Sequence, residues 1–137
     1  MIRSRVLLAE DDAVVAIDLA RELEAAGMVV SGMASSLAET LELIDAATPD
    51  IALLNVRLRD GVSFPAARRL KALNVPFAFL TSLERSEIAS EFRDIPRLSK
   101  PQVSSVIAEF VRHLAETRLA AIRRRGPGDI NPAGHSR

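Results

Sequence analysis

Five polar side chains stand at points where short strands are predicted to end. They are Glu10, Asp11, Asn55, Thr81 and Lys100. In an open α/β sheet the ligand or reaction site lies just outside the carboxyl ends of the strands, so each of these residues is a site candidate. Carboxylate and amide oxygens are ligands for hard cations such as Mg²⁺, and a carboxylate can also act as a nucleophile.

A third carboxylate, Asp12, follows the acidic pair at the start of a predicted helix. An acid at a helix amino terminus contributes only about 0.3–1 kcal/mol. Helix capping therefore explains one or two of these carboxylates better than all three. We interpret Asp12 as the helix-start acid and assign Glu10 and Asp11 to the site.

Apolar runs alternate with helical periodicity along the chain and predict the elements that position these groups. Strands are expected over residues 5–9, 28–33, 51–54, 77–80 and 97–99, and helices over 13–26, after Ser36, after Ser63, over 83–92 and from 102 to 125. Such alternation calls for a parallel sheet with helices on both faces. The sequence predicts an α/β fold with a doubly wound, five-stranded parallel sheet in the flavodoxin-like order 2-1-3-4-5. That order brings four of the strand ends to one edge.

Composition narrows the class of protein. Eighteen basic side chains balance eighteen acidic ones in 137 residues, so no general attraction to nucleic acid or to a membrane follows. Cysteine is absent, and no apolar run approaches the roughly twenty residues that cross a bilayer. We expect a cytoplasmic protein with one domain over residues 1–125 and a disordered tail over 126–137.

The polar residues lie in four short motifs: Leu8–Asp12, Pro49–Asn55 with Asp60–Gly61, Leu80–Ser82, and Leu98–Pro101. In this order and at these separations they resemble the receiver domain of bacterial response regulators (CheY-like), over about residues 5–113. The resemblance implies the (βα)₅ receiver fold and a role in two-component, phosphorelay signal transduction without enzymatic activity. It also implies a signalling protein as partner, either a histidine kinase or a downstream effector, and a homodimer through the fourth helix, fifth strand and fifth helix.

The resemblance also assigns roles to the pocket residues. In receiver domains an acidic pair holds Mg²⁺, an aspartate after the third strand accepts a phosphoryl group from a histidine kinase, and a hydroxyl and a lysine engage the phosphoryl oxygens. The acidic pair falls on Glu10 and Asp11, the hydroxyl on Thr81, and the lysine on Lys100. The acceptor position falls on Asn55.

Asn55 is the departure with the largest chemical consequence. An amide nitrogen has its lone pair delocalised into the carbonyl, so it does not form an acyl phosphate as a carboxylate does. Mg²⁺ binding should weaken, because the cluster drops from three negative ligands to two. A second departure is Arg97, which stands where the family usually keeps an aromatic switch residue. The sequence predicts a stand-alone pseudo-receiver that works by protein–protein binding.

Two alternatives stay open at this stage. The chain could be a phospho-competent regulator that uses another acceptor, such as Asp11 or Asp12, or one whose Asn55 was engineered from aspartate. A nucleotide- or flavin-binding enzyme on the same sheet is a weaker alternative. Three carboxylates after the first strand would repel a phosphate there.

Overall fold

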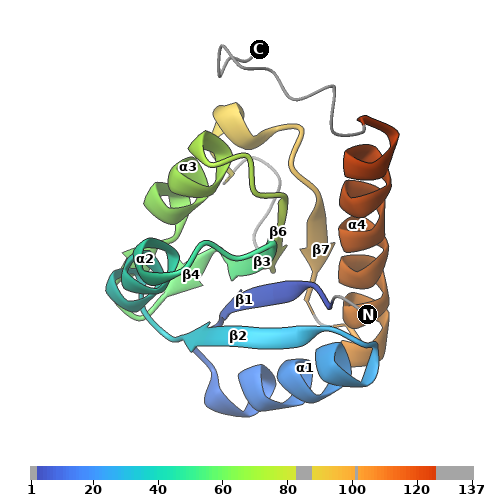
Figure 1. The fold of residues 1–137 in the computed structure, drawn as a ribbon. Helices are drawn as coiled ribbons and strands as arrows, with labels where there is room; N and C mark the ends of the chain where they lie inside the picture. The colour runs from blue at the N-terminus through green and yellow to red at the C-terminus, as the bar shows by residue number, and fades with distance from the viewer. Residues whose placement is uncertain (1–2, 83–87, 101, 126–137) are drawn as a thin grey trace.

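The main sheet has the predicted strand order. The computed structural model describes residues 3–82, 88–100 and 102–125. Its five-stranded parallel sheet has the order β2-β1-β3-β6-β7, and a short β4–β5 hairpin accounts for the gap in numbering (Figure 1). The strands are β1 (Arg5–Ala9), β2 (Val29–Ala34), β3 (Ile51–Asn55), β6 (Phe77–Thr81) and β7 (Arg97–Ser99). The predicted flavodoxin-like order of the five main strands is confirmed.

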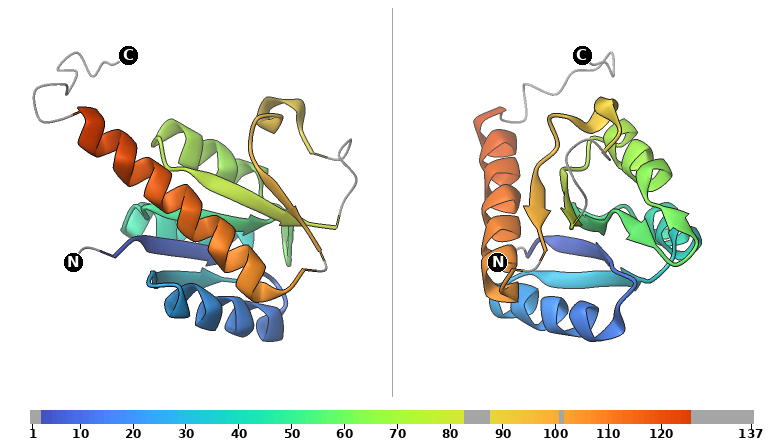
Figure 2. Two further views of the ribbon diagram at one scale, coloured as in Figure 1. Left: turned by 90° about the vertical axis from the view of Figure 1, so that its right-hand side faces the viewer. Right: turned by 180° about the vertical axis from the view of Figure 1, so that it is seen from behind.

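Helices cover both faces of this sheet. α1 (Ala13–Ala25) and α4 (Ser104–Arg125) lie against each other on one face, while α2 (Leu37–Ala46) and α3 (Phe64–Ala72) lie together on the other (Figure 1). Figure 2 shows α4 crossing the sheet face as a long, straight helix. No helix within the described ranges combines the length and apolar character that a membrane span requires.

Side-chain alternation along the strands divides the core into two clusters. In β3, Leu53 packs with the residues under α1 and α4, whereas Ala52 and Leu54 pack with those under α2 and α3. All five residues of β3 are buried, as expected for a central strand covered on both faces. The polar edge of the sheet therefore lies beside a core that is buried on both faces of the sheet.

Local capping explains where two of the helices begin. Asp12 caps α1, since its Oδ1 accepts the N–H groups of Val14 (3.0 Å) and Val15 (3.3 Å). Ser36 caps α2 through the amide of Glu39 at 3.1 Å. The helix therefore begins after Ser36 as expected, and the Glu39 carboxylate accepts the N–H of Ser35, one residue before the cap.

Three features differ from the predicted elements or lie outside the described residues. For the helix expected over 83–92, residues 83–87 are outside the described ranges, and the remainder contains only the 3₁₀ helix η2 (Ser90–Phe92). Ala89 has extended backbone angles (φ −56°, ψ 139°), which interrupt helical hydrogen bonding before Ser90. The hairpin of β4 (Arg57–Leu58) and β5 (Gly61–Val62) was not predicted. The tail over 126–137 also lies outside the described residues.

Candidate functional site

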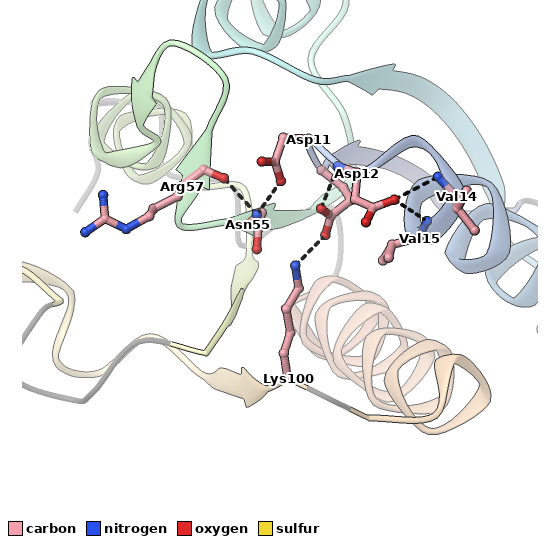
Figure 3. A network of polar contacts seen from close by, with 8 residues as sticks. Asp11, Asp12, Val14, Val15, Asn55, Arg57 and Lys100 are labelled. Atoms are coloured by element: carbon pink, nitrogen blue, oxygen red, sulfur yellow. Dashed lines mark hydrogen bonds and ion pairs between the residues drawn. The ribbon is translucent and has the colours of Figure 1, made fainter.

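The carboxyl ends of four neighbouring strands gather the predicted site residues at one edge of the sheet. Parallel pairing sets β1 beside β3, β3 beside β6, and β6 beside β7. Asp11, Asn55 and Lys100 consequently lie close together although they are far apart in sequence (Figure 3). Thr81 ends β6 and is buried, with Ser99 as its partner on β7.

Asn55 is held by two hydrogen bonds from a single nitrogen. Its side chain is buried, and Nδ2 donates to Asp11 Oδ1 at 2.9 Å and to the Arg57 backbone carbonyl at 2.7 Å (Figure 3). A primary amide nitrogen carries two hydrogens, so both are used. The amide thereby joins the loop after β1 to the start of the β4–β5 hairpin.

Glu10 forms the other half of the pocket. Its side chain is fully buried, Oε1 lies 3.1 Å from Lys100 Nζ, and Oε2 accepts the Asp12 N–H at 3.0 Å. Burial raises the pKa of Glu10 above its ordinary value of 4.5, while the Asp12 amide and the Lys100 ammonium oppose that rise. Glu10 and Lys100 therefore form an ion pair that joins the loop after β1 to the end of β7.

The remaining predicted residues occupy separate positions. Asp11 and Asp12 are exposed, and Asp12 is committed to capping α1. Arg97 opens β7, so it lies at the opposite end of that strand from Lys100. Its role as a switch residue stays a prediction.

The donor set, as arranged, does not fit a hard divalent cation. No cluster of three or more His, Cys, Asp or Glu residues suited to a metal occurs among residues 3–82, 88–100 and 102–125. Both oxygens of Glu10 are engaged, and the Asn55 amide occupies one oxygen of Asp11 together with the Arg57 carbonyl. Mg²⁺ prefers several free oxygen ligands in near-octahedral geometry. The weakened Mg²⁺ site expected on Glu10 and Asp11 stays a prediction from the sequence, and the engagement of these oxygens argues against it.

Sequence reasoning missed three contributors. The Arg57 carbonyl is a backbone group that no sequence pattern marks. Asp60 was named only as part of a motif, yet its carboxylate accepts the N–H groups of Leu37 and Ala38 at the start of α2. An open groove of about 560 Å³ between α1 and the start of α4 also adjoins the pocket, with Val14 and Lys100 in its lining. The signal for the groove was an apolar residue, Val14, on the outer side of an amphipathic helix.

Comparison with known proteins reveals similarity to response regulators. No family model matches the sequence. The transcriptional regulatory protein PdtaR of Mycobacterium tuberculosis is 32% identical over 93 residues, which are 66% of this chain and 44% of that protein. The chain thus spans less than half the length of the curated relatives it matches.

Two solved structures are similar over most of the chain. SdrG from Sphingomonas melonis Fr1 has 32% identity and a TM-score of 0.68, over 82% of this chain and 97% of SdrG. The receiver (REC) domain of the response regulator PhyR from Erythrobacter litoralis has 21% identity and a TM-score of 0.73, over 84% of this chain and 91% of that domain. The second likeness concerns the fold alone.

Proposed function

The chain belongs to the response-regulator receiver family, and from this membership we propose that it signals by binding a protein partner without accepting a phosphoryl group at position 55. The observation that carries the proposal is the state of Asn55. Its side chain is neutral and buried, and its nitrogen is committed to Asp11 and Arg57. In this proposal the protein is a binding module and has no enzymatic activity.

The chemistry at position 55 supports this proposal. Phosphoryl transfer to a side chain needs an attacking atom with an available lone pair, and the lone pair of a carboxamide nitrogen is delocalised. In this pocket the nitrogen also donates both hydrogens, so it faces Asp11 and Arg57 as a donor. Neither its electronic state nor its orientation suits attack on phosphorus.

The proposed partner is a signalling protein, either a histidine kinase or a downstream effector. The surface we assign to it, by analogy with the family, comprises η2, β7 and α4. The same surface is the one proposed for a homodimer. Sedimentation velocity over a range of protein concentrations tests the homodimer, because self-association increases the sedimentation coefficient with concentration.

Intact-mass measurement tests the loss of phosphorylation. The purified protein is incubated with Mg²⁺ and a small phosphodonor such as acetyl phosphate. We expect no phosphoryl adduct on the natural chain and an adduct on Asn55→Asp. Asn74→Asp is the matched control, because it makes the same chemical change at an exposed residue at the end of α3. A stable adduct on the natural chain would contradict the proposal.

Fragmentation of any such adduct distinguishes the remaining candidates. Phosphate on Asp11 would favour a phospho-competent regulator with a shifted acceptor, since that carboxylate is exposed and adjoins the pocket. Phosphate on Asp12 would require release of the α1 cap. A nucleotide- or flavin-binding enzyme would instead show a melting temperature that rises with those ligands.

A further inference from the structure

The Asn55 amide also bears on how the pocket is held together. We infer that the carboxamide nitrogen of Asn55 takes over the structural task of a divalent cation, so that the folded chain joins its strand ends without Mg²⁺. The inference goes beyond the proposed function, because a pocket can fail to accept phosphate and still require a metal.

The two acceptors of Asn55 are both oxygens of the kind that hard cations bind. One belongs to the Asp11 carboxylate and the other to the Arg57 backbone carbonyl, at 2.9 Å and 2.7 Å from the amide nitrogen. Two such oxygens facing each other without a positive group between them would repel. The NH₂ group supplies a partial positive charge to each of them, and it does so from a side chain already fixed at the end of β3.

Binding a cation at these oxygens would carry a further cost. The cation would have to displace both hydrogen bonds of an amide that is only 7% exposed. A buried polar group that loses its partners is destabilising. Glu10 offers no compensation, because its two oxygens are held by Lys100 and by the Asp12 amide.

Aspartate at position 55 would reverse this arrangement. A carboxylate there would face the Asp11 carboxylate and the Arg57 carbonyl, with no hydrogen to donate to either. Repulsion would weaken the folded state in the absence of metal, while the two facing carboxylates and the Arg57 carbonyl would attract a hard cation. The amide therefore replaces the metal in addition to removing the phosphoacceptor.

Thermal unfolding in EDTA and in Mg²⁺ tests the inference. For the natural chain we expect the same melting temperature in both, at matched ionic strength. For Asn55→Asp we expect a melting temperature several degrees lower in EDTA, and a rise when Mg²⁺ is added. Mg²⁺ at about ten times its dissociation constant would increase the folded-to-unfolded ratio about elevenfold. The exposed-site control Asn74→Asp should have the same melting temperature in EDTA and in Mg²⁺, whatever the substitution itself costs at a residue with φ of +59° just after α3.

Paramagnetic broadening gives a second readout that does not depend on stability. Substoichiometric Mn²⁺ should selectively broaden the backbone amide signals of residues 10–12 and 55–57 in Asn55→Asp and leave them sharp in the natural chain. Selective broadening in the natural chain, or a melting temperature that rises with Mg²⁺, would overturn the inference. An Asn55→Asp protein that folds and ignores both ions would also overturn it, since the amide would not then be what excludes the metal.

The natural chain alone decides the question if Asn55→Asp does not fold. Its response to Mg²⁺ and Mn²⁺ is sufficient to contradict or support the inference. The two proposals also fail separately. A phosphoryl adduct on the natural chain refutes the proposed function, whereas a metal response without an adduct refutes only the metal-free pocket.

Discussion

Replacing Lys100 with methionine should destabilise the protein by an amount that depends on pH. Methionine keeps an apolar stem of similar length but removes the ammonium that lies 3.1 Å from Glu10 Oε1. Within the described chain that oxygen has no hydrogen-bond partner besides this ion pair. The substitution therefore leaves half of a buried carboxylate unpaired.

The size of the loss follows from burial. Removing one partner of a fully buried ion pair typically costs about 3–5 kcal/mol. The Lys100 side chain is 28% exposed, so water can partly replace it, and we expect a loss of about 2–3 kcal/mol at neutral pH. In a domain of this size each kcal/mol lowers the melting temperature by about 3–5 °C, which predicts a fall of about 6–15 °C.

The pH dependence follows from the direction of the Glu10 shift. Burial raises the pKa of Glu10 in the folded state above its ordinary value of 4.5. A group with a raised folded-state pKa contributes stability below its unfolded pKa, and that contribution is lost as pH rises through the folded pKa. Lys100 opposes the rise, so its removal raises the folded pKa of Glu10 further. The difference between natural chain and variant should be largest near neutral pH and should shrink as pH falls toward 4.5.

Urea unfolding, followed by circular dichroism at neutral pH and near pH 4.5, measures the difference in stability. The matched control is Lys71→Met, because Lys71 is exposed and its ammonium donates to the backbone carbonyl of Glu91. We expect this control to lose less than about 1 kcal/mol of stability, independent of pH. The double variant Glu10→Gln with Lys100→Met should recover part of the lost stability, since it leaves no buried charge unpaired. Equal losses at both pH values, or a double variant no more stable than Lys100→Met, would refute the reasoning.

Three further predictions concern the frame around the pocket. Asp60→Ala should lower the melting temperature, because the Asp60 carboxylate accepts the N–H groups of Leu37 and Ala38. These hydrogen bonds hold the pKa of Asp60 below its ordinary value of 3.8. The melting temperatures of the variant and the natural chain should therefore converge in acid below pH 3.8. Gly61→Ala should cost about 1–3 kcal/mol in urea unfolding, because φ is +140° there, and unchanged stability would show that the hairpin adapts without strain. Phe92→Ala should cost about 3–5 kcal/mol in urea unfolding. The buried Phe92 ring packs against the rings of Phe64, Phe77 and Phe79, at centroid distances of 5.5, 6.3 and 5.6 Å. A loss under about 1 kcal/mol would show that this aromatic cluster contributes little to stability.

Much of the fold could be predicted because its signals are local. The central strands β1, β3 and β6 are short apolar runs, and each polar group that follows a strand is visible in the sequence. Sheet topology then requires these groups to converge. Lys100, expected at this edge from its place after the fifth strand, forms an ion pair with Glu10 there.

The parts that sequence did not predict depend on backbone atoms or on long-range contacts. For the helix expected over 83–92, the described residues 88–92 contain only the 3₁₀ helix η2, and the extended backbone of Ala89 is a conformation that no local pattern in the sequence marks. The contact of Asn55 with the Arg57 carbonyl depends on how the hairpin folds back. The capping of α2 by Asp60 joins residues more than twenty positions apart, which local capping patterns do not reveal.

The division of the core by the sheet bears on how this protein can change through evolution. The cluster under α1 and α4 and the cluster under α2 and α3 share no side chain, since neighbouring residues of each strand point to opposite faces. Substitutions in separate clusters without shared partners usually have additive effects. One helical layer can therefore diverge toward a new binding specificity while the other preserves the stability inherited from its ancestor.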